Sequence, residues 1–303
     1  MERIAAVVVT YNRKELLLQC VQALLNQQDA VCDVLVVDNA STDGTQQAVQ
    51  QLGHSRLYYQ NTQSNLGGAG GFHFGMKWAV EQGYDYVWIM DDDCLPAPTA
   101  LNELWQAHQT LKGGYGFLSS VVLWKDGKEC RMNRQKIKKS YYEQIELLSR
   151  GMVQIEQATF VSLFFPAKVI QAVGLPLKEY FIWGDDIEYT RRISVRNGMP
   201  CYLVGKSIVT HLMEHNTGSN LATDVPGRID RYRYAFRNEN FTYRQEGLRG
   251  IVYYLARCGL NFVRVVAQAK SHRCKRIWVL ISSMVKGCFF HPAVEYPASG
   301  TEQ

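Results

Sequence analysis

Three consecutive carboxylates, Asp91, Asp92 and Asp93, follow an apolar stretch in the segment YDYVWIMDDD. At a partly exposed site, two like charges ~4 Å apart repel by about 4 kcal/mol before screening. A divalent cation would remove this repulsion, and carboxylate oxygen is a ligand that Mg²⁺ and Mn²⁺ prefer. The alternatives are a solvated acidic turn or the cap of a following helix. The apolar run before the aspartates predicts that they end a buried strand.

Apolar β-branched runs alternate with helical patterns ahead of these aspartates. We predict strands over 4–11, 32–41, 55–61 and 84–93, and helices over 13–27, 41–52 and 70–83. The second helix is expected to use Ser41 or Thr42 as its N-cap. This alternation indicates parallel βαβ units in a doubly wound α/β sheet. Polar residues follow all four strands and should converge at the sheet edge where such folds bind ligands.

Two of these polar segments have several interpretations. The glycine-rich NLGGAGGF (65–72) could bring backbone amides close to an anion at a helix N-terminus. It matches neither GxGxxG nor GxxxxGK[ST], so a flexible turn is an equal alternative. Asp38 and Asn39 could bind a ribose or a base, form an Asx-turn with a helix cap, or do both.

A second acidic group lies in WGDDIEY, where Trp183 precedes Asp185, Asp186 and Glu188. A Trp face can stack on a sugar ring, and a neighbouring carboxylate could act as a general base on a hydroxyl. The alternative is a helix N-terminus enriched in acids, which the helix dipole favours. His211 ends a further strand predicted within 199–216. It is either an ordinary core or surface residue or a third ligand for Mn²⁺.

Basic residues are concentrated in the C-terminal part of the chain. Between Arg228 and Lys286 there are 13 Lys and Arg residues against 3 Asp and Glu, whereas the whole chain is only +5. We therefore expect a body over 1–225 and a basic helical region over 226–303. The latter mixes apolar stripes with basic residues, which suits an anionic membrane surface, a helical pair packed on the body, or an oligomer contact. The basic excursion over 131–151 is either a mobile surface loop or an acceptor-side loop.

Bulk composition excludes several classes of protein. With 303 residues and 47% hydrophobic content, the chain can bury a sizeable core. Its eight cysteines form no CxxC pair, which argues against a zinc site and fits a reduced cytosolic protein. No signal peptide is visible, and the apolar run at 277–285 is too short to span a bilayer. An acidic binding edge would repel nucleic acid, so we expect no nucleic-acid partner.

In chain order, these segments resemble the family 2 glycosyltransferases, the nucleotide-sugar-dependent enzymes of the GT-A fold. The resemblance covers about 3–216 and rests on VVVTYNR, VVDNASTDGT, NLGGAGGF, MDDD, WGDDIEY and THLMEH. RYAFRNENF (233–241) is similar to the Tyr/Arg-Asn segment that follows the catalytic domain in bacterial members. NLGGAGGF joined to MDDD looks most like the galactofuranosyltransferases. The implied fold is a mixed, mostly parallel GT-A sheet with the basic helical region as an appendage.

The resemblance also implies roles for individual residues. Asp91 and Asp93 would hold Mn²⁺ or Mg²⁺, with His211 as third ligand. The base would be Asp186, although the Gly before the acidic pair leaves Asp185 open. Trp183 and Glu188 would lie on the acceptor side. The nucleotide and donor sugar would be bound by Thr10, Tyr11, Asn12, Arg13, Asp38, Asn39, Asn65, Gly67, Gly68, Gly70, Gly71 and Asp92.

The expected reaction is an inverting, metal-dependent transfer of galactofuranose from UDP-galactofuranose to a saccharide or lipid-linked glycan, in cell-surface polysaccharide synthesis. A rhamnosyl- or other hexosyltransferase using a dTDP- or UDP-sugar is the alternative. A nucleotidyltransferase and a noncatalytic nucleotide-binding module are the competing classes. The expected location is the cytoplasm, with peripheral contact to the inner face of the cell membrane and homo-oligomerisation as open options.

Overall fold

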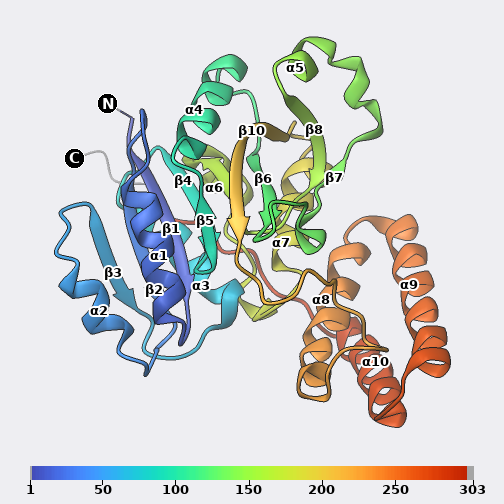
Figure 1. The fold of residues 1–303 in the computed structure, drawn as a ribbon. Coiled ribbons are helices and arrows are strands. Elements are labelled where there is room, and N and C mark those ends of the chain that lie inside the picture. The colour runs from blue at the N-terminus through green and yellow to red at the C-terminus, as the bar shows by residue number, and fades with distance from the viewer. Residues whose placement is uncertain (1, 299–303) are drawn as a thin grey trace.

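The computed structural model describes residues 2–298, which form a mixed ten-stranded sheet, helices that pack on it, and a group of C-terminal helices at one end (Figure 1). The strand order is β3-β2-β1-β4-β9-β6-β10-β8-β7, and β5 pairs with β10. The strands are β1 (Ile4–Thr10), β2 (Asp33–Asp38), β3 (Leu57–Asn61), β4 (Tyr86–Asp91), β5 (Cys94–Pro96), β6 (Leu118–Trp124), β7 (Lys136–Ile137), β8 (Met152–Gln157), β9 (Leu163–Pro166) and β10 (Tyr202–His211). The helices are α1 (Lys14–Leu25), α2 (Thr45–Gln51), α3 (Gly67–Glu81), α4 (Ala100–Leu111), α5 (Ile145–Ser149), α6 (Ala167–Val173), α7 (Asp185–Arg191), α8 (Tyr232–Arg244), α9 (Gly247–Gln268) and α10 (Arg273–Cys288).

The centre of the sheet is buried on both faces, as the continuous apolar run of β1 predicts. Successive side chains of a strand point to opposite faces. Ala6 and Val8 of β1 therefore belong to the core that includes α1 and α4, whereas Val7 and Val9 belong to the core that includes α3 and α6. The first four predicted strands are confirmed and pair in parallel in the order β3-β2-β1-β4.

The predicted N-cap of the second helix is wrong. Helix α2 begins at Thr45 after Gly44, which has a left-handed backbone (φ +84°). The Asp43 carboxylate accepts hydrogen bonds from the backbone N–H and the hydroxyl of Thr45. Ser41 and Thr42 bond instead to Asn12, which ties the turn after β2 to the turn after β1.

The second half of the sheet is mixed. Strand β9 is antiparallel to both β4 and β6, whereas β10 is parallel to β6 and carries His211 at its end. The basic segment over 131–151 folds into short elements, including α5 and β7, and β7 pairs with β8.

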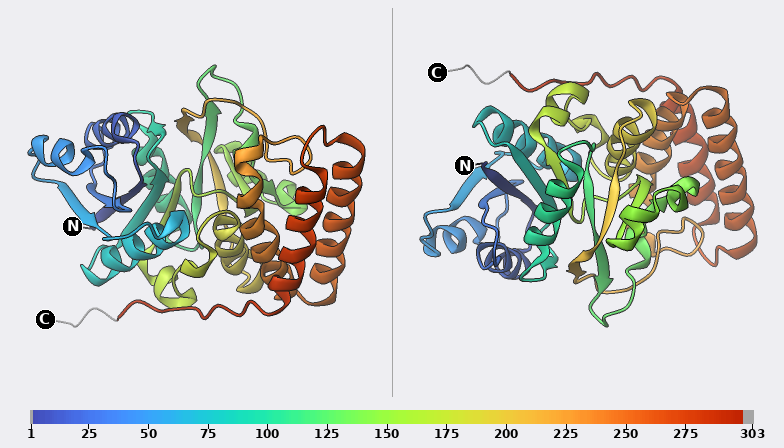
Figure 2. Two further views of the ribbon diagram at one scale, coloured as in Figure 1. Left: turned by 90° about the horizontal axis from the view of Figure 1, so that it is seen from below. Right: turned by 90° about the horizontal axis from the view of Figure 1, so that it is seen from above.

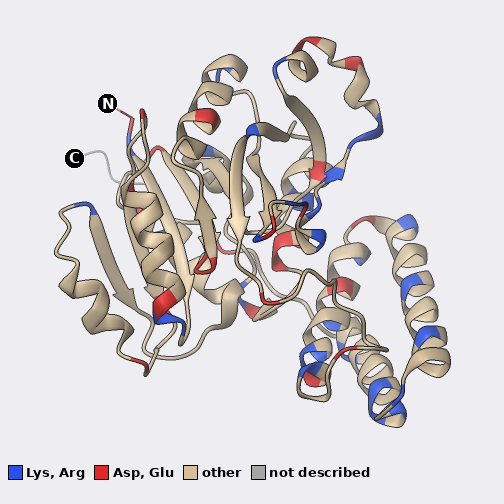
Figure 3. Ribbon diagram, viewed as in Figure 1, with Lys and Arg blue, Asp and Glu red and all other residues tan. Residues whose placement is uncertain are grey.

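The C-terminal helices α8, α9 and α10 pack together beside the sheet (Figures 1 and 2). Lys and Arg residues gather on them, as the sequence predicts (Figure 3). The chain after α10 then runs back along the sheet domain (Figure 2). There the Glu295 carboxylate contacts His73, Lys77 and Lys178. The last described residues belong to the predicted C-terminal region (226–303). They nevertheless contact the predicted body (1–225) on the other side of the proposed boundary.

Helix α9, rather than the segment 277–285, is the apolar helix of greatest length in this region. Among residues 2–298 it is the only helix long and apolar enough to cross a membrane by length and composition, with a mean hydropathy of 1.2. Only 22% of its apolar window is buried in the structure.

Candidate active site

The parallel register brings the predicted polar segments together at one edge. Thr10 at the end of β1 pairs with Asp38 at the end of β2. On the other side of β1, Val9 pairs with Asp91 at the end of β4. Asp38 also pairs in register with Asn61 at the end of β3. The predicted convergence is therefore observed, and each of these polar groups lies at the end of a strand.

Two of the three aspartates have close side-chain partners. The Thr10 hydroxyl donates to one Asp92 carboxylate oxygen at 2.7 Å. The Arg13 guanidinium lies 3.2 Å from the other Asp92 oxygen and 3.0 Å from Asp93. Arg13 thus partly offsets the repulsion that the aspartate run creates. Its side chain is 52% exposed, so the arginine can turn toward an incoming anion.

Burial dominates the protonation of these aspartates. It raises the pKa of Asp91 to about 7, and repulsion from Asp93 adds to this effect. Burial also raises the pKa of Asp92 to about 6, although Arg13 opposes the shift. Burial alone would raise the pKa of Asp93 as well, but contact with His211 outweighs it and lowers that pKa below its usual value. A positive charge beside Asp91 and Asp93 would remove the free-energy cost of ionising both carboxyl groups.

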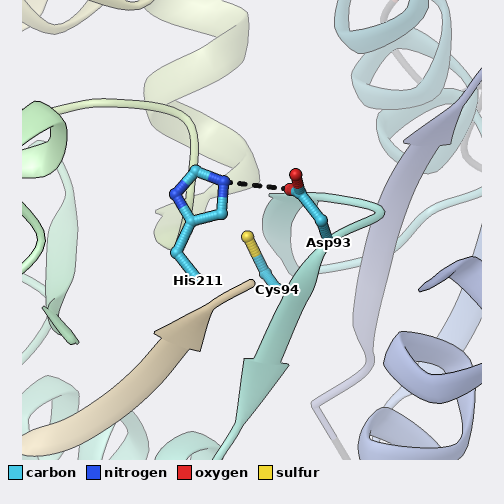
Figure 4. Close-up of side chains that lie close together, drawn as sticks. All are labelled: Asp93, Cys94 and His211. Carbon is cyan, nitrogen blue, oxygen red and sulfur yellow. Dashed lines mark ion pairs between the residues drawn. The ribbon is translucent and has the colours of Figure 1, made fainter. Parts of the chain in front are cut away.

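His211 completes a candidate ligand set. Its Nε2 lies 3.0 Å from Asp93 Oδ1 (Figure 4). Asp93 Oδ1 is buried and has no hydrogen bond of good geometry among the described residues. The other ring nitrogen, Nδ1, lies 2.8 Å from the amide oxygen of Asn133, which can only accept. Nδ1 therefore carries a hydrogen, and Nε2 faces the aspartates as a metal-binding histidine would.

The residues fit a divalent cation held by oxygen and imidazole. Asp93, Cys94 and His211 have potential ligand atoms within 4.8 Å of one another (Figure 4). Burial raises the pKa of the Cys94 thiol well above its usual value, so it stays protonated and is a poor ligand. Asp93 and His211 supply a carboxylate oxygen and an imidazole nitrogen to this group, and the expected ligand set for Mn²⁺ or Mg²⁺ adds Asp91 from the end of β4.

The second acidic pair begins helix α7. Asp186 accepts a hydrogen bond from the backbone N–H of Ile187, and burial raises its pKa to about 6. The pKa of Asp185 is raised well above its usual value, first by burial and then by repulsion from Asp186 and Asp91. The charge of Asp91 is therefore one of those that act on the Asp185 carboxyl. Of the pair, Asp186 is the more readily ionised at neutral pH.

The structure places Glu188 differently from the sequence-based expectation of an acceptor contact. Its side chain is 1% exposed, and its carboxylate pairs with Arg192 and Arg196. Glu188 therefore stabilises the α7 region from inside. Trp183 is half-buried, has a left-handed backbone (φ 65°), and packs edge-on against Tyr232 with ring centroids 5.0 Å apart.

Most of the glycine-rich segment serves packing instead of forming a flexible loop. Helix α3 starts at Gly67, within this segment. A Cβ on Gly71 would lie 2.4 Å from a Val9 methyl group, and one on Gly67 would lie 2.0 Å from the Phe181 carbonyl oxygen. Gly70 is also buried, against Leu66. Gly68 alone among these glycines has open space around the Cβ position, so its backbone remains accessible to a ligand.

The remaining predicted donor-site residues line the same edge. Tyr11 is 45% exposed, and Asn12 has a left-handed backbone. Asp38 is fully buried and accepts hydrogen bonds from the backbone N–H of Ser41, three residues on, and from the Tyr59 hydroxyl, so its side chain closes the turn after β2. The side chains of two asparagines fix the start of α3. Asn39 donates to the Gly67 carbonyl, and Asn65 accepts from the Gly67 N–H.

Sequence reasoning missed two buried asparagines near the acidic groups. Asn133 accepts from His211, and Asn238 contacts the loop before Asp185. Both lie far in sequence from the residues that they touch, so no local pattern points to their contacts. The only signal was the likeness of RYAFRNENF, which includes Asn238, to a segment of bacterial family members.

Comparison with known proteins identifies the family of this chain. The sequence model described as Glycosyl transferase family 2 matches residues 5–156. Galactofuranosyltransferase GlfT1 of Mycolicibacterium smegmatis is 29% identical over 264 residues, covering 83% of this chain and 86% of that protein. GlfT1 of Mycobacterium tuberculosis is 27% identical over 271 residues, with 83% and 85% coverage. Undecaprenyl-phosphate mannosyltransferase of Micrococcus luteus is 35% identical over 114 residues, covering 36% of this chain and 45% of that protein.

Solved structures agree on the fold. GalNAc-T7 with UDP, GalNAc and Mn²⁺ superposes with a TM-score of 0.63 at 11% identity, covering 80% of this chain. This chain spans about half of the GalNAc-T7 chain, with 48% coverage. Staphylococcus aureus TarS superposes with a TM-score of 0.53 at 14% identity, covering 95% of this chain and 72% of that one. The chain belongs to glycosyl transferase family 2 and is a glycosyltransferase with the GT-A fold.

Proposed function

We propose that the protein transfers galactofuranose from UDP-galactofuranose to a saccharide or lipid-linked glycan, inverting the anomeric carbon. The main support is the convergence of the ends of β1, β2 and β4, with Asp38 and the aspartate run, in a chain that resembles GlfT1 over 83% of its length. The product would serve the synthesis of a cell-surface polysaccharide.

Asp91, Asp93 and His211 would hold Mn²⁺ or Mg²⁺ at this edge, and Asp92 would face the ribose or the donor sugar. A bound divalent cation supplies positive charge to the diphosphate as it leaves. Arg13 is exposed beside the aspartates and would add a second positive charge to the leaving diphosphate. The nucleotide would lie along Thr10, Tyr11 and Asn12 with Asp38 and Asn39. The accessible backbone at Gly68, with Asn65, would face the donor.

Asp186 is the proposed general base. The acceptor hydroxyl attacks the anomeric carbon, the bond to the nucleoside diphosphate breaks, and the hydroxyl proton passes to Asp186. A pKa of about 6 leaves this carboxylate ionised at neutral pH yet basic enough to take a proton during attack. Beside it, burial and the charges of Asp186 and Asp91 raise the pKa of Asp185 well above its usual value. Trp183 would offer its ring face to the acceptor sugar.

A transfer assay tests this function. The purified protein is incubated with UDP-galactofuranose, Mn²⁺ and octyl glycosides of common hexoses. Glycosylated product is detected by mass spectrometry, and its anomeric configuration is determined by NMR. We expect a product of inverted configuration, and we expect Asp186→Asn to abolish it while UDP still binds. Product formation by Asp186→Asn would move the base to Asp185. Product from dTDP-rhamnose, and none from UDP-galactofuranose, would favour the rhamnosyltransferase alternative. Nucleotide binding without any transfer would favour a binding module.

We also propose that helix α9 docks on an anionic membrane surface, where a lipid-linked acceptor would be found. The helix contains no Asp or Glu, and Arg249 and Arg264 are exposed on it. A face this basic would repel a second copy of itself but attract anionic headgroups. The exposed large apolar side chains of α9 are Leu248, Ile251, Val252, Tyr253, Leu255, Leu260, Phe262, Val263 and Val266. The enzyme would then work at the inner face of the cell membrane.

Vesicle sedimentation at low salt tests the membrane contact. We expect binding to vesicles that contain phosphatidylserine and none to pure phosphatidylcholine. Val263→Asp places a charge at a 60% exposed position of α9 and should reduce binding. The matched control is Val31→Asp, at a 63% exposed valine between α1 and β2, which should bind like the wild type. Absence of binding to anionic vesicles, or self-association abolished by Val263→Asp, would contradict the membrane assignment.

A further inference from the structure

The loop before the second acidic pair has an unusual backbone. Phe181, Trp183 and Gly184 all have positive φ angles of 62°, 65° and 87°. Residues with side chains rarely adopt this region, so the surrounding structure must hold the loop in place. Asp185 follows immediately as the first residue of α7. The direction of both aspartates therefore depends on how this loop is held.

Asn238 of helix α8 holds the loop from behind. Its side chain is fully buried. The amide nitrogen lies 2.8 Å from the Trp183 carbonyl oxygen, 3.0 Å from that of Tyr180 and 3.3 Å from that of Ile182. Arg237 donates to the amide oxygen at 2.9 Å and 2.8 Å. Only donors surround the oxygen and only acceptors surround the nitrogen, so the orientation of the amide is fixed.

A reciprocal contact runs from the loop back to α8. The buried Tyr180 hydroxyl donates to the Asn238 backbone carbonyl at 3.1 Å and hydrogen-bonds the Thr242 hydroxyl at 2.9 Å. Asn238 itself lies outside the acidic edge and has no contact with Asp91, Asp93 or His211 among its hydrogen bonds. It can act on the acidic pair only by holding the backbone that leads to it.

We propose that Asn238 is a positioning residue for the acidic pair, and that α8 is a structural part of the active site. Its amide sets the path of residues 180–184 and so aims Asp185 and Asp186 at the donor edge. This inference rests on the proposed transferase reaction. It predicts that loosening the loop lowers the rate of the chemical step and leaves nucleotide binding intact, because the nucleotide-binding residues lie on other elements.

The test compares Asn238→Ala with Asn240→Ala, which removes an amide from the same helix that bonds to Met284 of α10 instead of the loop. For Asn238→Ala we expect kcat to fall by about tenfold or more, because small misplacements of catalytic groups cost this much. The UDP dissociation constant should stay within about twofold of the wild type, which separates positioning from binding. Hydrogen exchange in residues 180–187 should be faster in Asn238→Ala alone.

A milder variant covers the case in which Asn238→Ala does not fold. Tyr180→Phe removes only the hydroxyl that bonds to α8, and it should also lower kcat without weakening UDP binding. Unchanged kcat in a folded Asn238→Ala, or in Tyr180→Phe if the former does not fold, would overturn the inference. An inactive wild type would instead contradict the proposed function, and unchanged hydrogen exchange in Asn238→Ala would still overturn this inference.

Discussion

Substituting Glu188 should lower the stability of the fold, and not primarily acceptor binding, because Glu188 belongs to a buried ion pair. Glu188 and Arg192 have side chains that are 1% and 6% exposed, and they lie 2.5 Å apart. Glu188→Ala would leave the Arg192 charge buried without its partner. Arg192 also donates to the carbonyls of Val173 and Leu175, at 3.1 Å and 2.9 Å, so it cannot turn to solvent without losing these bonds.

The expected loss of stability in Glu188→Ala follows from the burial of Glu188 and Arg192. Breaking a buried ion pair by removing one partner typically costs about 3–5 kcal/mol. Arg196, the second partner, is 23% exposed and can reach water, which favours the lower end of that range. A loss of about 3 kcal/mol corresponds to a fall in Tm of roughly 5 °C in a chain of this size. Thermal unfolding followed by circular dichroism would measure it.

A matched control uses an exposed ion pair. Glu146 and Arg150 are 81% and 53% exposed, so Glu146→Ala should change Tm by less than about 2 °C. The packing explanation is refuted if Glu188→Ala keeps the wild-type Tm while transfer to the acceptor fails. That result would restore the acceptor role that the sequence suggested for Glu188.

Two further predictions concern the base and the glycine-rich helix. If Asp186 is the base, kcat/KM should rise with pH and level off above its pKa of about 6, because the protonated carboxyl cannot accept a proton; a flat profile through pH 6 would assign the base elsewhere. Gly71→Ala should lower stability by about 1–3 kcal/mol, because the new methyl group would lie 2.4 Å from Val9. The matched control is Gly68→Ala, whose new methyl group would meet nothing within 4 Å, so this variant should unfold at or above the wild-type temperature. Equal losses of stability in both variants would contradict the packing role of Gly71.

The strand ends could be predicted because local sequence determines them. Uninterrupted β-branched runs give buried parallel strands, and polar residues at their ends must then meet at one edge. The sequence pattern alone therefore places Asp38, Asp91 and the residues after Thr10 at this edge, where the structure has them. His211 is also correctly placed at a strand end, and its metal-binding role stays a prediction.

Other features depend on contacts that local patterns do not encode. The antiparallel insertion of β9 between β4 and β6 needs pairing across the whole domain. His211 lies 78 residues from Asn133 along the chain, and Trp183 lies 55 residues from Asn238. Glu188 did carry an overlooked local signal, because Arg192 follows at i+4 on the same helical face. Glycines spaced by four at 67, 71 and 75 likewise indicated close helix packing.

The central claim is that the aspartate edge binds a nucleoside diphosphate together with a divalent cation. Thermal shift of the wild type and of Asp93→Ala, with UDP, dTDP and GDP each with and without Mn²⁺, tests it most directly. A ligand at about 100 times its dissociation constant adds about 2.7 kcal/mol of stability. We predict a Mn²⁺-dependent shift with UDP in the wild type and its loss in Asp93→Ala. A shift that is independent of Mn²⁺ or unchanged in Asp93→Ala, or no shift with any nucleotide, would contradict the account.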